Sequence, residues 1–90
     1  MNNSFSSRLT MAFAEKNYQL AISGKQEITK LALARLLWPN SNDDSRNVNI
    51  QRLFNGSTKA VLPDWVSIIC FVLDKEPNFF FEKLTELPIN

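Results

Sequence analysis

Two glycines and four prolines are the strongest breakers of regular structure in this 90-residue chain, and they constrain its fold more than any other feature. They stand at Gly24, Pro39, Gly56, Pro63, Pro77 and Pro88. Between them, apolar residues recur every three or four positions, which is the spacing of a helix that packs on one side. No segment has a convincing strand pattern. The sequence therefore predicts an all-α fold of five short helices.

Capping residues refine the boundaries of these helices. The predicted helices span about residues 4–18, 29–38, 43–55, 63–73 and 79–84. The second helix has two candidate starts, a capping box from Ser23 and the preferred cap Thr29. The third is expected to take its N-cap from residues 43–45, and Gly56 suits its C-terminal end. Because residues 39–45 are turn formers, we expect a long and mobile loop there.

Composition and length exclude several classes of protein. The chain is 44% hydrophobic and 21% charged, which is typical of one soluble domain, here residues 1–90 with an ordered core at about 5–85. Its apolar runs are too short for a membrane helix and its N-terminus lacks a signal peptide, so we expect a cytoplasmic protein without membrane contacts. The single cysteine, Cys70, excludes an internal disulfide and is expected to be a small buried residue.

Histidine is absent, which removes the usual general base, the His-containing zinc sites and the histidine-dependent nucleophilic arrangements. No other constellation of catalytic or metal-binding residues stands out. We therefore expect no enzyme activity, no cofactor, no metal and no small-molecule ligand.

Charge is distributed unevenly along the chain. Residues 1–60 carry eight Lys or Arg against four Asp or Glu, whereas residues 61–90 carry two against five. Such an asymmetry is consistent with one face for a polyanion and another for a different contact. Chance accounts for a small excess equally well.

The third predicted helix carries the most informative side chains. Its apolar stripe is Ile50, Leu53 and Phe54, and its other face is rich in amides, although Asn is a poor helix former. That face consists of Arg46, Asn47, Val48, Asn49, Gln51 and Arg52. Asn and Gln pair with adenine edges, Arg pairs with guanine, and Val contacts the thymine methyl group. From these residues alone, DNA recognition and a merely solvated face remain equally good interpretations.

The stretch from Val48 to Gly56 resembles the recognition helix of lambda-repressor-like helix-turn-helix domains. The segment Thr29–Leu37, with Leu33-Ala34, resembles the first helix of that motif, and Pro63–Leu73 and Pro77–Phe81 resemble the last two helices. The resemblance covers about residues 6–84. It implies a compact five-helix bundle in which helices two and three form the helix-turn-helix. This sequence departs from the pattern at Trp38-Pro39, where the family usually has Gly and a shorter turn.

The resemblance also implies the roles of individual residues. Base contacts fall on Asn47, Val48, Asn49, Gln51 and Arg52. Contacts to the DNA backbone fall on Lys30, Arg46, Asn55, Thr58 and Lys59. The implied core is Leu33, Ala34, Leu37, Ile50, Leu53 and Phe54. The function expected is that of a sequence-specific transcriptional regulator, a repressor of phage or mobile-element type, whose partner is double-stranded DNA.

Three consecutive phenylalanines near the C-terminus exceed what one small core needs. Phe80 matches a position that the family buries, which leaves Phe79 or Phe81 as the predicted contact across the two-fold axis of a homodimer. The alternative is that all three rings fold back over the first or fourth helix.

A second reading of the whole chain is a helical protein-interaction module that keeps the fold but does not bind DNA, for example the partner of a toxin or of another regulator. The two readings differ in one geometric expectation. DNA binding is favoured if Lys30, Arg46, Arg52 and Lys59 converge on one surface, and protein interaction is favoured if they scatter.

Overall fold

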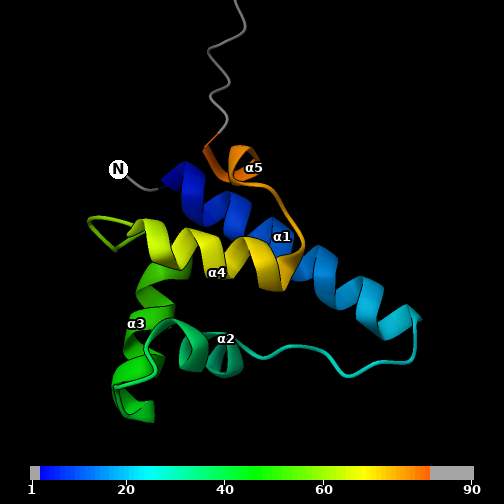
Figure 1. Cartoon of the computed structure of the whole chain (residues 1–90), viewed down its shortest axis with the longest axis horizontal. Helices are drawn as coiled ribbons and strands as arrows, with labels where there is room; N and C mark the ends of the chain where they lie inside the picture. The colour runs from blue at the N-terminus through cyan, green and yellow to red at the C-terminus, as the bar shows by residue number, and fades with distance from the viewer. Residues whose placement is uncertain (1–2, 82–90) are drawn as a thin grey trace, which may run out of the picture.

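Five α-helices joined by irregular segments make up the computed structural model, which describes residues 3–81 (Figure 1). They are α1 (Asn3–Ile22), α2 (Lys30–Leu37), α3 (Asp43–Asn55), α4 (Pro63–Leu73) and α5 (Pro77–Phe81). Within residues 3–81 there is no strand, so the predicted all-α fold of five helices is confirmed. The predicted end of the last helix at residue 84 lies outside the described residues. No described helix is both long and apolar enough to cross a membrane.

Every helix contributes to a single core. α1 packs on α3, α4 and α5, while α2 packs on α3 and α4. The six core residues implied by the resemblance are all buried, which confirms them, and the remaining core residues are Phe5, Leu9, Ala12, Val66, Ile69, Leu73 and Phe80. α4 supplies three of these and contacts α1, α2 and α5, so it links the helices at the centre of the bundle.

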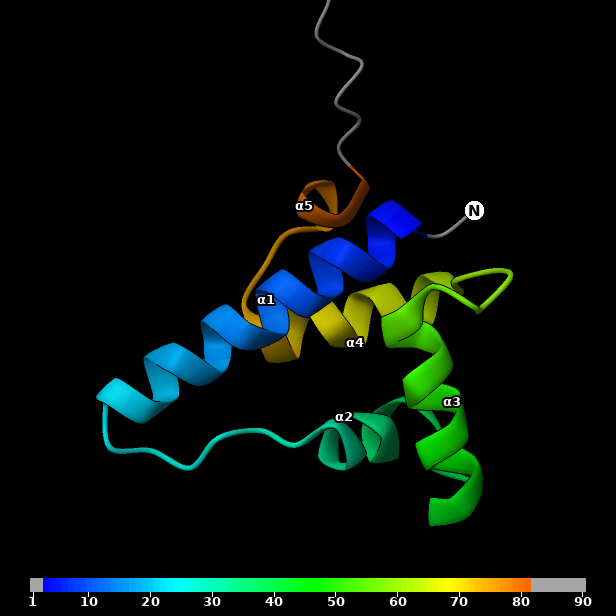
Figure 2. The same cartoon turned by 180° about the vertical axis from the view of Figure 1, so that it is seen from behind.

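α1 is longer than the sequence suggested and protrudes from the bundle. Its last turns extend past the other helices in both views (Figures 1 and 2). The predicted serine caps lie within the helix instead, where Thr10 donates to the carbonyl oxygen of buried Ser6 (2.9 Å). The chain turns at Gly24, whose φ of 75° favours glycine, and residues 25–29 return in an extended conformation.

One asparagine ties this returning segment to α1. Asn17 donates from Nδ2 to the carbonyl oxygen of Ile28 (2.9 Å), and the Ile28 amide donates to Asn17 Oδ1 (2.7 Å). The side-chain amide thereby satisfies both backbone groups of a residue outside any helix or sheet. This pair of hydrogen bonds fixes the position of Ile28 against α1, directly before the cap of α2.

The caps of α2 and α3 follow ordinary capping chemistry, with one correction. The Ala32 amide donates to Thr29 Oγ1 (3.0 Å), which confirms Thr29 as the cap of α2. The predicted cap of α3 at residues 43–45 was wrong, because Asn42 accepts from the Ser45 amide (2.8 Å). The two aspartates that follow lie in the first turn, where negative charge favours the helix dipole. Gly56 ends α3 with a φ of 84°, as predicted.

Candidate nucleic-acid interface

The exposed face of α3 lies opposite its buried stripe. Because successive residues turn by about 100°, the side chains of Val48 and Arg52 project away from Ile50 and Leu53. Both are exposed, and so are the other predicted contacts Asn47, Gln51 and Asn55. Asn49 is half-buried on one flank. The amide-rich face therefore has no other helix packed over it within the described chain.

A groove of about 450 Å³ joins this face to the segment between α3 and α4. Its lining residues are Trp38, Asn49, Arg52, Ser57, Thr58, Lys59 and Trp65. Four of them were predicted from sequence as DNA contacts, two on bases and two on the backbone. The structure thus brings Asn49 and Arg52 beside Thr58 and Lys59, with two cationic side chains at one concave surface.

A second hollow of about 500 Å³ continues the first around α3. It shares Asn49 and Arg52 with the first groove and adds Ser41, Asp44, Ser45 and Val48. The two hollows together form one curved surface along the N-terminal half of the helix and the following loop. We call it the α3 surface. Asp44 is its acidic member, so the charge of this surface is mixed at one end and positive at the other.

The tryptophan pair is a feature of the α3 surface that sequence reasoning missed. Trp38 and Trp65 meet edge to face, with ring centroids 5.4 Å apart, and both are partly buried against the core. Trp65 packs against the core, and it also lines the groove. The departure at Trp38-Pro39 was a usable signal, because a tryptophan in place of glycine must find a surface to cover.

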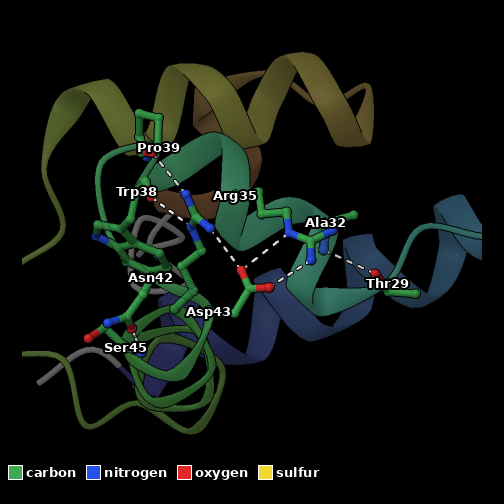
Figure 3. Close-up of polar contacts among 9 residues, drawn as sticks. Thr29, Ala32, Arg35, Trp38, Pro39, Asn42, Asp43 and Ser45 are labelled. Atoms are coloured by element: carbon green, nitrogen blue, oxygen red, sulfur yellow. Dashed lines mark hydrogen bonds and ion pairs between the residues drawn. The ribbon is translucent and has the colours of Figure 1, made fainter.

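Arg46 does not lie on the α3 surface, although the sequence predicted it to contact DNA. Its Nε donates to the carbonyl oxygen of Trp38 (2.9 Å), Nη2 donates to that of Pro39 (2.8 Å), and Nη1 donates to Asp43 (2.8 Å) (Figure 3). The side chain is only 15% exposed. Arg46 therefore holds the connection between α2 and α3 in place, and its guanidinium is directed at the protein.

The loop between α2 and α3 is shorter than expected, and the same contacts hold it against α3. Only residues 38–42 separate the two helices, instead of the predicted residues 39–45. Asp43 also accepts two hydrogen bonds from Arg35, from Nη2 at 2.7 Å and from Nε at 3.3 Å (Figure 3). Hydrogen bonds from Arg35 and then from Arg46 lower the pKa of Asp43 to about 2. One carboxylate thus links α2, the loop and α3.

The remaining predicted backbone contacts lie at two other places. Lys30 is exposed at the first position of α2, with its Nζ 4.6 Å from the centroid of the Phe54 ring. Asn55 accepts from the Ser57 amide (2.9 Å) and so shapes the turn that leads to Thr58 and Lys59. Two of the four cations expected to converge, Arg52 and Lys59, line the same groove. The other two do not line it, because Lys30 lies over the Phe54 ring and Arg46 is largely buried against the loop before α3.

The three phenylalanines of α5 have different environments. Phe80 is buried, as predicted, while Phe79 meets it edge to face and lies under the cationic groups of Arg8 and Lys75. Phe81 is 51% exposed and stacks on Phe5. Both predicted dimer contacts therefore also pack within their own chain.

Two sequence expectations concern chemistry other than nucleic-acid binding. The described residues contain no group of three or more His, Cys, Asp or Glu side chains placed to hold a metal ion. Cys70 is partly buried, and this burial raises the pKa of its thiol. A raised thiol pKa is the opposite of what a reactive cysteine requires.

Comparison with known proteins finds no matching family model, no matching curated protein and no matching solved structure. The resemblance to lambda-repressor-like domains therefore rests on the residues themselves. What this chain does must be inferred from the surface described above.

Proposed function

We propose that this protein is a sequence-specific regulator that binds double-stranded DNA, a repressor of phage or mobile-element type. In this proposal α2 and α3 act as a helix-turn-helix, and α3 enters the major groove. The observation that carries the proposal is the α3 surface, where Asn49 and Arg52 share one groove with Thr58 and Lys59. Side chains that hydrogen-bond base edges and side chains that bind phosphates are both needed for specific recognition.

The chemistry of α3 supports base recognition. An exposed helix that carries Val48, Asn49, Gln51 and Arg52 offers an apolar contact for a thymine methyl group, amides for adenine and a guanidinium for guanine. The major groove is about 12 Å wide and admits one α-helix. The described chain leaves this face uncovered, so it can approach the base edges directly.

The electrostatics of the surroundings support contact with the DNA backbone. Asp43 is neutralised by Arg35 and Arg46, which removes one of the two negative charges at the start of α3 from the field that a phosphate would meet. Lys59 stands on the loop beside the same groove, and Lys30 stands on α2. Cations on either side of a recognition helix fit phosphates on either side of the groove.

Selection of bound sites from a random duplex library tests this proposal. We expect enrichment of one short sequence, which the wild type binds far better than bulk DNA at moderate salt. Lys59→Ala should weaken binding to all sequences alike, whereas Asn49→Ala should relax the choice of base at one position.

The matched control for Lys59→Ala is Lys25→Ala. Lys25 follows the far end of α1, a segment that both views place away from α3 (Figures 1 and 2), and its removal should leave binding unchanged. If no selected duplex competes better than bulk DNA, the proposed function is wrong.

A helical protein-interaction module is the second candidate, and two observations favour it. Arg46 has withdrawn from the surface, and Phe71 on α4 is 88% exposed. Phe71 follows Pro63 and Ser67 on one stripe of α4, and those two residues line an apolar hollow of about 330 Å³ together with Phe81. If this second candidate is right, Phe71→Ser abolishes binding of a protein partner, and Arg52→Ala leaves that binding unchanged.

A further inference from the structure

α1 has an apolar stripe on its solvent side that the described chain leaves uncovered. Met11, Tyr18 and Ile22 are 57%, 68% and 67% exposed, and Ala14 and Ala21 are also exposed. With a turn of about 100° per residue, these five side chains lie on the face of α1 opposite the buried residues of the same helix. We call these five residues the α1 stripe.

The stripe occupies α1 from Met11 to Ile22, and the last turns of this segment extend past the other helices (Figures 1 and 2). On the same face, the part of the helix next to the bundle carries Ser4 and Ser7, which are polar and exposed. The change from polar to apolar occurs at Met11, and the stripe then continues to the end of the helix. Both views place this end beyond the other helices (Figures 1 and 2). Because the whole stripe lies on the side of α1 that faces away from the core, a second helix can approach it without meeting the bundle.

The spacing of the stripe is that of a helix-helix seam. Met11, Ala14, Tyr18 and Ala21 are separated by three, four and three residues, which is the alternation of core positions in a coiled coil. Large and small side chains alternate along it. Small residues let two helices approach closely, and a large residue needs a small one opposite to it.

We propose that the occupant of the α1 stripe is the α1 stripe of a second copy of this chain, packed antiparallel across a two-fold axis. With the axis level with residue 16, Met11 lies opposite Ala21 of the second copy, and Tyr18 lies opposite Ala14 of the second copy. Met11 and Tyr18 then each meet a small side chain, and Ile22 lies opposite Thr10 of the second copy. This self-complementarity is what a two-fold symmetric interface requires, and a parallel pair would set Tyr18 against Tyr18.

The area and the flanking charges are compatible with such a pair. The exposed parts of the stripe amount to roughly 500 Å² per copy, so a pair would bury at most about 1,000 Å², which is the size of a weak interface. We therefore expect a dissociation constant in roughly the micromolar range. Glu15, at the edge of the stripe, is bonded to Lys75 of its own chain, which neutralises its charge.

This interface differs from the dimer contact predicted at Phe79 and Phe81. Each of those rings already packs on another ring of its own chain. The α1 stripe has no such partner within the described residues. The inference goes beyond the proposed function and does not depend on it, because none of the stripe residues belongs to the proposed DNA interface.

Sedimentation equilibrium of the full chain tests the proposal. The wild type should be a dimer at tens of micromolar, and Tyr18→Ser and Ala14→Glu should each raise the dissociation constant at least tenfold with unchanged circular dichroism. Gln19→Glu, an exposed change on the same helix but off the stripe, and Phe81→Ser should leave the dimer intact. A monomeric wild type at about 200 µM, or dissociation by Phe81→Ser alone, overturns the proposal.

Cysteine cross-linking tests the antiparallel register, with Cys70→Ser as the background. Met11→Cys and Ala21→Cys proteins should form a mixed disulfide when combined, because the two positions face each other only in the antiparallel pair. Disulfides require Cα atoms within about 7 Å, so the reaction is selective for register. Efficient cross-linking of each variant with itself, without the mixed product, would contradict the antiparallel register.

Discussion

The exposed faces of α3 and α1 differ in chemistry, although both helices contribute to the same core. The face of α3 is polar, rich in amides, and hollowed by two grooves where it meets the loops on either side. The solvent-facing side of α1 is apolar from Met11 to Ile22. A polar concave surface suits a hydrated and charged partner, whereas an apolar stripe at coiled-coil spacing suits another helix. The comparison therefore supports the proposal that two different partners bind on two sides of one small domain.

The two arginines of α3 sharpen this comparison, because only one of them serves the exposed face. Arg46→Ala removes charge-assisted hydrogen bonds to the carbonyl oxygens of Trp38 and Pro39 and to Asp43. We expect the free energy of unfolding to fall by about 2 kcal/mol in urea denaturation. Arg35→Ala is the matched control, because it also removes a partner of Asp43 but leaves the two carbonyl contacts. Equal losses in the two variants would show that the carbonyl contacts contribute nothing.

Arg52→Ala should have the opposite profile. Arg52 lines the groove, so its removal should weaken DNA binding by about 1–3 kcal/mol and relax the choice of base at one position. Its unfolding free energy should change by less than about 0.5 kcal/mol, because the side chain is exposed. Fluorescence titration with a selected duplex measures the first quantity and urea denaturation the second. A stable Arg52→Ala protein with unchanged affinity for every duplex would remove this residue from the interface.

Asn42→Ala tests the cap that positions the start of α3. The variant loses the hydrogen bond from the Ser45 amide, and we expect a cost of about 1 kcal/mol in unfolding free energy. Asp44→Ala serves as the comparison, because Asp44 was one of the caps predicted from sequence and here lies in the first turn. If Asp44→Ala lowers the unfolding free energy more than Asn42→Ala does, Asn42 is not the residue that caps α3.

Acid should weaken the junction between α2 and α3 before it affects the α1 stripe. The pKa of Asp43 is about 2 in the folded protein, below its ordinary value of 3.8, so the folded state binds this proton less readily than the unfolded state. Its contribution to stability is complete above about pH 4 and is lost as the pH falls through about 2. We expect the urea midpoint to decline in that window, and to decline less in Asp43→Asn. An identical acid profile in the two proteins would contradict this role.

Local chemistry is what the sequence predicted well. Thr29 as a cap, Gly56 as a helix end and the apolar residues of α2 and α3 all act within a few positions of the chain, so spacing alone identified them. The withdrawal of Arg46 was not predictable, because it depends on where two carbonyl oxygens of the preceding loop come to lie. The Trp38–Trp65 contact was not predictable either, because it joins residues far apart in sequence.

Nuclear magnetic resonance of the isotope-labelled protein, titrated with a selected duplex, tests most directly whether α3 and α1 have separate partners. The account predicts that the largest shifts of backbone amide signals occur in residues 44–52 and 57–59. Signals of residues 11–22 should stay in place on adding DNA and should shift instead when the protein is diluted. Shifts concentrated in residues 11–22 on adding DNA, with the signals of α3 unmoved, would contradict the account.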